Sequence, residues 1–159
     1  MKLNQISLSL LFLIVPLFIV PLFAVDVAAQ KVNAATQKAI VKQMVSDRAL
    51  TNDCVREAGG ASKIVSIKSM DLNSDGKPEY IVEGNSGCAF GANSPFSWVY
   101  GKNGNGYKML FDAGLNQGIS RKKTKTNGYF DLKVTYLGNA SSNWEAESTT
   151  HKFNGTRYQ

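Results

Sequence analysis

The fold is decided by the stretch Asp71-Leu72-Asn73-Ser74-Asp75-Gly76-Lys77-Pro78-Glu79. It lies between two apolar, β-like runs, Ile64–Met70 and Tyr80–Glu83, and therefore predicts a turn between two strands. Oxygen-bearing side chains stand at its first, third, fifth and ninth positions, and Gly76 permits a sharp bend. The pattern is typical of a metal-binding loop or, alternatively, of a hairpin whose Asp and Asn side chains bond backbone N–H groups.

A hard cation such as Ca²⁺ binds about six to eight oxygens, and alternate positions in a tight loop can point at one centre. The predicted ligands are Asp71, Asn73, Asp75, the Lys77 carbonyl and Glu79. An EF-hand would need a bidentate glutamate at the twelfth position, where this chain has Val82, and a helix on each side. The sequence therefore predicts a calcium site of another kind, with a structural role.

The loop resembles the strand–loop–strand calcium site of FG-GAP/VCBS-type repeats, Asp-x-Asp/Asn-x-Asp-Gly-x-x-Asp/Glu followed by an apolar strand. The resemblance covers about a dozen residues in a single copy, so the propeller architecture of those repeats is not expected here. More broadly, the chain resembles small exported bacterial proteins of unknown role. The pieces that carry this second likeness include Trp98-Val99-Tyr100, Asn127-Gly128-Tyr129 and Phe153-Asn154-Gly155.

Residues Met1–Ala29 have the three parts of an export signal. Lys2 gives a positive start, Ile6–Ala24 is a long apolar run, and small residues follow at Val27-Ala28-Ala29. The sequence predicts cleavage after Ala29, which makes residues 1–29 a signal peptide and residues 30–159 a single α+β domain. The alternative is a retained membrane anchor, because the apolar run is long enough to span a bilayer. We expect a periplasmic or secreted protein, free of the membrane after cleavage.

The two cysteines, Cys54 and Cys88, predict one disulfide, because an even pair in an oxidising compartment usually forms a bridge. The formal net charge of +6 is spread along the chain, and its densest run is Arg121–Lys125. Such a run is typical of an edge strand that is protected against pairing with another sheet. Export argues against a nucleic-acid partner, so the expected partner is an envelope or extracellular protein or glycan.

The sequence predicts an α+β fold, with an N-terminal amphipathic helix packed on an antiparallel meander sheet of about 6–8 strands. The helix is expected over Lys31–Ala58 and is ended by Gly59-Gly60. Alternating apolar residues and turn signals then predict a series of strands. Their expected ranges are Lys63–Met70, Glu79–Glu83, Pro95–Tyr100, Tyr107–Phe111, Gly118–Lys125, Tyr129–Leu137, Trp144–Phe153 and Arg157–Gln159.

Few other residues suggest chemistry. His151 lies in a period-2 segment and is expected on a strand surface, while Asp131, Glu145 and Glu147 are expected to be solvated strand charges. The aromatic residues at alternating spacing are expected to form a core under the helix.

The leading hypothesis is an exported, non-enzymatic binding or accessory domain of the cell envelope, stabilised by calcium. The alternative is a small secreted hydrolase that uses carboxylates or His151 on the open face of the sheet.

Overall fold

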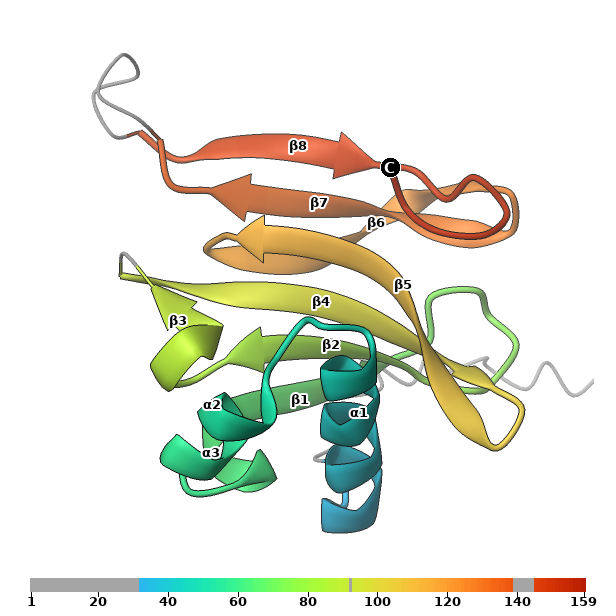
Figure 1. Ribbon diagram of the computed structural model, residues 1–159. Coiled ribbons are helices and arrows are strands. Elements are labelled where there is room, and N and C mark those ends of the chain that lie inside the picture. Colours follow the sequence, from blue (N-terminus) through green and yellow to red (C-terminus); the bar gives the residue numbers. More distant parts are fainter. Residues whose placement is uncertain (1–31, 92, 139–144) are drawn as a thin grey trace, which may run out of the picture.

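The computed structural model describes residues 32–91, 93–138 and 145–159 (Figure 1). The predicted signal peptide, residues 1–29, and its cleavage site lie outside these residues. Among the described residues, no helix is long and apolar enough to cross a membrane.

The described chain begins with three short helices, α1 (Ala34–Ser46), α2 (Asn52–Glu57) and α3 (Ala61–Ile64). The prediction of one continuous helix over Lys31–Ala58 is therefore wrong. The chain turns after α1, where Arg48 takes a left-handed conformation with φ of 63°. Helical structure resumes after Thr51, whose side chain accepts a hydrogen bond from the Cys54 N–H and so caps α2.

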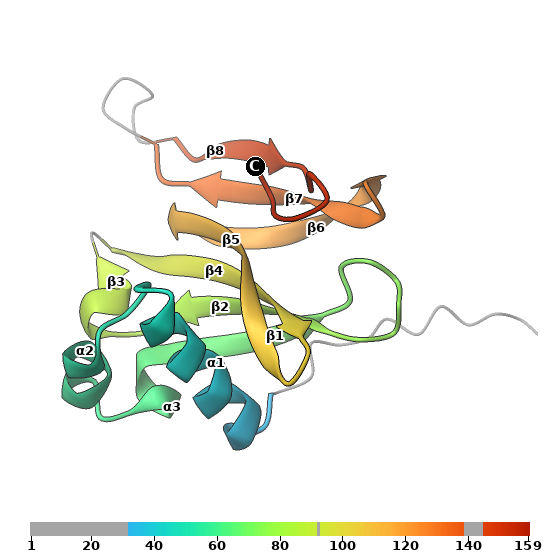
Figure 2. The ribbon, with the colours of Figure 1, turned by 45° about the vertical axis from the view of Figure 1, so that its right-hand side comes forward.

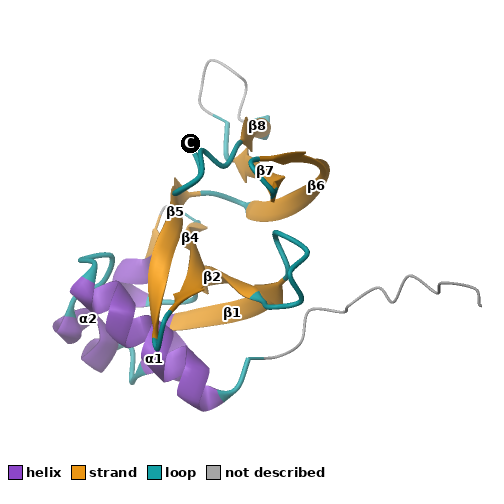
Figure 3. Ribbon diagram, turned by 90° about the vertical axis from the view of Figure 1, so that its right-hand side faces the viewer, coloured by secondary structure: helices purple, strands orange, loops and turns teal. Residues whose placement is uncertain are grey.

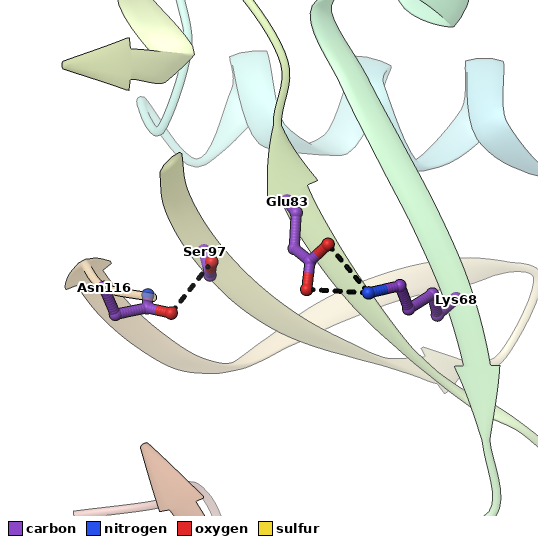
Figure 4. Close-up of polar contacts among 4 residues, drawn as sticks. All are labelled: Lys68, Glu83, Ser97 and Asn116. Atoms are coloured by element: carbon purple, nitrogen blue, oxygen red, sulfur yellow. Dashed lines mark hydrogen bonds and ion pairs between the residues drawn. The ribbon is translucent and has the colours of Figure 1, made fainter. Parts of the chain in front are cut away.

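The first sheet contains β1 (Val65–Met70), β2 (Glu79–Gly84), β3 (Phe90–Gly91), β4 (Ser94–Asn103) and β5 (Gly106–Leu115). Its central strand is β4, which pairs with β2 and β3 and with β5, while β1 pairs with β2. Every one of these pairs is antiparallel. A cross-strand ion pair of 3.0 Å joins Lys68 on β1 to Glu83 on β2 (Figure 4).

The second sheet contains β6 (Gly118–Thr126), β7 (Tyr129–Tyr136) and β8 (Glu147–His151), also antiparallel and in that order. The chain leaves the first sheet at Asn116, which is fully buried and accepts a 3.3 Å hydrogen bond from the Ser97 hydroxyl (Figure 4). The backbone N–H of Asn116 also donates to the Pro95 carbonyl oxygen. These bonds fix the point where the meander changes sheets.

The predicted antiparallel strands are therefore present, eight in the described residues, but the single sheet is a wrong expectation because they form two sheets. The last two predicted strands are also shorter than expected. The segment predicted as Trp144–Phe153 is a strand only over Glu147–His151, and Trp144 lies outside the described residues. Arg157–Gln159 contributes only an isolated bridge between Tyr158 and Phe153.

The first sheet is covered on both faces, by the helices on one and by the second sheet on the other (Figures 1, 2 and 3). Along β2, Tyr80 and Val82 pack in the core under the helices, whereas Ile81 packs in the core between the sheets. Burial on both faces explains why Tyr80-Ile81-Val82, in the middle of β2, is an apolar run without alternation. Of the aromatics expected under the helix, Trp98, Tyr100 and Tyr107 lie there. The expectation is wrong for Phe111, Tyr129 and Tyr136, which pack between the sheets.

The predicted disulfide is confirmed. It joins Cys54 on α2 to Cys88 on the short helix η1 (Gly87–Ala89), with the two Cα atoms 6.0 Å apart. The bridge attaches the helical layer to the segment that leads from β2 into β3. Gly84, the last residue of β2, is required for this arrangement because any side chain there would overlap the backbone of Ala89.

Candidate functional site

The Asp71 loop, residues 71–78, connects β1 to β2, as the sequence predicts. Asp71 organises it from the first position. Its Oδ1 accepts hydrogen bonds from the backbone N–H groups of Asn73 and Ser74, at 3.1 and 2.6 Å, and its Oδ2 accepts one from Gly76 at 3.0 Å. Burial alone would raise the pKa of Asp71, but these backbone bonds stabilise the carboxylate and lower its pKa below the ordinary 3.8.

Asn73 and Asp75 continue the same pattern. The Asn73 Oδ1 accepts a bond from the Asp75 N–H at 2.9 Å, and the Asp75 Oδ1 accepts one from the Lys77 N–H at 2.7 Å. The Asn73 amide nitrogen donates to the Asp75 Oδ2 at 3.2 Å and lies 3.5 Å from the Glu79 Oε1. The amide group of Asn73 therefore lies between two of the predicted ligands.

Glu79, the ninth residue of the stretch, begins β2 and is only 5% exposed. Its Oε2 accepts a 2.8 Å hydrogen bond from the backbone N–H of Leu72, the second residue of the loop. Burial raises the pKa of Glu79, and the negative charges of Asp75 and Asp71 raise it further. Among the described residues, no ion pair involves Glu79. The loop thus holds a buried carboxylate beside two others.

The outer side of the loop contacts the second sheet. Arg121 on β6 donates to the Asp71 carbonyl oxygen at 3.0 Å, and Lys125 donates to the Asn73 carbonyl oxygen at 3.1 Å and to the Ser74 hydroxyl at 2.8 Å. Both cations also lie over the ring of Phe130, 4.4 and 4.2 Å from its centre. These contacts bring two positive charges to backbone carbonyl oxygens of the loop.

The sequence does not predict the contacts that the basic run Arg121–Lys125 makes with the Asp71 loop. The run does lie on β6, an edge strand of the second sheet, as expected of a charged edge. Its contacts with the Asp71 loop join residues some fifty positions apart in sequence, which the packing of the two sheets brings together. No local sequence signal reports such a contact.

The structure brings the predicted ligands Asp71, Asn73, Asp75 and Glu79 together in one loop. Within the part of the chain that is described, however, no three His, Cys, Asp or Glu side chains form a group that could hold a metal ion. The three carboxylates of the predicted set, those of Asp71, Asp75 and Glu79, therefore do not form such a group by themselves; the set also includes the Asn73 amide oxygen and the Lys77 carbonyl oxygen.

Of the three acidic residues expected to be solvated strand charges, Asp131 differs from the prediction. Asp131 is 3% exposed and accepts short bonds from the hydroxyls of Thr124 and Thr126, at 2.6 and 2.7 Å, so the expectation of a solvated charge is wrong for it. The bond from Thr124 lowers the pKa of Asp131, against the effect of its burial. Glu145 and Glu147 are exposed, as expected.

His151, the last residue of β8, is half-buried rather than on a free strand surface. Its Nε2 lies 3.2 Å from the Tyr136 hydroxyl, and its ring centre lies 4.6 Å from that of Phe111. Burial lowers the pKa of His151 below the ordinary 6.5. These neighbours give His151 a packing role at the end of the second sheet.

Comparisons of the chain with protein-family models, with curated proteins and with solved structures found no match to any of them.

Proposed function

We propose that this protein is an exported, non-enzymatic binding or accessory domain of the cell envelope, and that Ca²⁺ bound in the Asp71 loop stabilises it. The observation that carries the calcium proposal is the burial of the Glu79 carboxylate beside Asp71 and Asp75. The disulfide between Cys54 and Cys88 supports export, because such bonds persist in oxidising compartments.

The chemistry of the donors fits a hard cation. Each carboxylate oxygen has two lone pairs, so an oxygen that accepts one backbone N–H still has a lone pair for a metal. Asp71, Asn73, Asp75, Glu79 and the Lys77 carbonyl would hold the ion, and Gly76 already adopts the positive φ, 78°, that the bend requires. Calcium would supply the positive charge that offsets the repulsion between Glu79 and its two acidic neighbours.

The test is the melting temperature of the purified protein in EDTA and over a calcium series. At a free calcium concentration ten times the Kd, a single site that is specific to the folded state adds about 1.4 kcal/mol. For a domain of this size that energy raises the melting temperature by roughly 3–8 °C. Magnesium at the same concentration is expected to have a smaller effect, because it retains its water shell and demands octahedral geometry.

Two variants make the result specific. Asp75→Asn keeps an oxygen that can accept the Lys77 N–H but removes one negative charge, so it should fold and lose most of the calcium effect. Asp53→Asn is the matched control, because Asp53 is exposed on α2 and paired with Arg56. An unchanged melting temperature at millimolar calcium, or an equal shift in both variants, would leave the loop as a hydrogen-bonded turn.

A further inference from the structure

A groove of about 650 Å³ lies between α1 on one side and α2 and α3 on the other. The helices that form it stand side by side below the first sheet (Figures 1 and 2). Its volume is within the range of small-molecule sites, about 300–1,000 Å³. The groove could not be predicted from the sequence, because the predicted helix over Lys31–Ala58 has no break between α1 and α2.

The floor of the groove is apolar. Val41 is almost fully buried at its base, and the half-buried side chains of Val45 and Val55 form its walls with Ala61. The polar group at its inner end is satisfied within the protein, since the Gln37 amide nitrogen donates to the carbonyl oxygens of Ala61 and Val65, at 3.1 and 2.8 Å. Ser46, Asn52 and Ser62 also line the groove, so an occupant would meet the valine side chains along its floor and polar groups beside them.

The rim of the groove is positively charged. Lys38 and Lys42 lie one helical turn apart on α1, are both exposed, and both line the groove. None of the groove-lining residues is acidic. In the described parts of the chain, neither lysine forms an ion pair. Lys38 and Lys42, beside the apolar floor of the groove, are complementary to a molecule with an anionic head and a hydrocarbon tail.

We propose that the groove binds a single-chain anionic amphiphile of the fatty-acid type. The carboxylate lies at Lys38 and Lys42, and the acyl chain lies against Val41, Val45 and Val55. Between Lys38 and Ser46, α1 is about 12 Å long at 1.5 Å per residue, which gives room for a short extended chain along the helix. This ligand class extends the binding role proposed above but concerns a different site, so a negative calcium result leaves it unaffected.

The test is calorimetric titration with fatty carboxylates of increasing length, each kept below its micelle concentration. The protein is produced through an export pathway with its own leader, and its mass shows whether residues 1–29 remain. The affinity should rise by up to about fourfold per added methylene until the groove is full. The matched fatty alcohol should bind roughly two- to tenfold more weakly than the carboxylate at low salt. High salt should remove that difference.

Three variants assign the binding to the groove. Lys38→Gln combined with Lys42→Gln should abolish the preference for carboxylate over alcohol but keep the dependence on chain length. Val45→Asn should weaken carboxylate and alcohol alike by at least severalfold, with Val55→Ser as a second variant of the same wall. Lys133→Gln, an exposed lysine on β7, is the control and should bind as the unaltered protein does.

Several results would overturn the proposal. One is the absence of binding by any monomeric carboxylate, including the case where only vesicles of anionic phospholipid bind. Another is affinity that does not depend on chain length. A third is binding that neither the lysine pair nor the valine variants alter, because the ligand would then lie elsewhere.

Discussion

At the scale of single residues, Glu79 is a carboxylate whose burial opposes folding at neutral pH. Its folded pKa is raised above the ordinary 4.5, so the contribution of protonated Glu79 to stability is complete below that pH and is lost as pH rises through the folded pKa. We therefore expect Glu79→Gln to raise the free energy of unfolding in EDTA at pH 7, because the neutral amide buries no charge. The same variant should lose the stabilisation by calcium. Urea denaturation in EDTA and in calcium measures both effects, and a variant less stable than the unaltered protein in EDTA would contradict them.

The pKa of Asp131 is shifted in the opposite direction from that of Glu79. Its folded pKa is lowered below 3.8, mainly by the hydroxyl of Thr124, so its stabilising effect is complete above that pH and is lost as pH falls through the folded pKa. Thr124→Val removes a 2.6 Å bond to a charged group and should cost about 1–3 kcal/mol at pH 7. It should also shift acid unfolding to higher pH. Thr149→Val, at an exposed position of the neighbouring strand β8, is the control, and an equal acid midpoint in both variants would show that Thr124 does not act through Asp131.

The sequence predicts some of these residue roles and not others, for a physical reason. The bonds of Asp71 and Asp75 join residues two to five apart, so the spacing of the loop predicts them. The bonds of Asp131 depend on the pairing of β6 with β7, whose register shifts between Arg121 and Lys125. A shift of this kind changes which side chains face each other, and alternation alone does not reveal it.

At the scale of secondary-structure elements, the helical region shows why apolar periodicity overestimates helix length. Leu50 fits the helical pattern and is buried, yet it lies in the turn after α1. A buried residue in a turn can continue the period of the preceding helix, which hides the break. The Thr51-Asn52-Asp53 sequence is a capping signal with an acidic first turn, and it marks the true start of α2.

The disulfide is the covalent link between these short helices and the sheet. It closes a loop of 34 residues, which in the chain-entropy model corresponds to about 4 kcal/mol of stability. We expect Cys54→Ser combined with Cys88→Ser to lower the free energy of unfolding by about that amount, measured by urea denaturation. Reduction of the unaltered protein should give the same loss. A much smaller effect would mean that α2 and η1 remain docked through their other contacts.

At the scale of the whole molecule, the strands were predictable but their division into two sheets was not. Tight turns at Asn103–Gly106 and Asn127-Gly128 predict hairpins that the structure contains. Whether consecutive hairpins stay in one sheet depends on contacts such as those of buried Asn116 with Ser97 and Pro95. These are contacts between residues about twenty positions apart, and an isolated polar residue does not predict them.

The C-terminal segment joins the two sheets, and Tyr158 makes the joining contacts. Its N–H donates to the Leu110 carbonyl oxygen on β5, and its hydroxyl donates to the Phe130 carbonyl oxygen on β7, at 2.8 and 2.9 Å. The ring is 3% exposed and lies 5.4 Å from that of Phe153. We expect Tyr158→Ala to cost about 3–5 kcal/mol, as for a buried aromatic residue.

Tyr158→Phe separates the hydroxyl bond from the packing and should cost about 1 kcal/mol. Arg157→Ala is the neighbouring control, because the Arg157 side chain is exposed and its bonds to Asn154 are made by its backbone N–H and carbonyl oxygen. Urea denaturation followed by tryptophan fluorescence measures all three variants, since Trp98 is buried in the first sheet. If Tyr158→Ala were as stable as the unaltered protein, the sheets would be held together without the C-terminal segment. The Asp71 loop, through Arg121 and Lys125, would then be the principal polar connection between them.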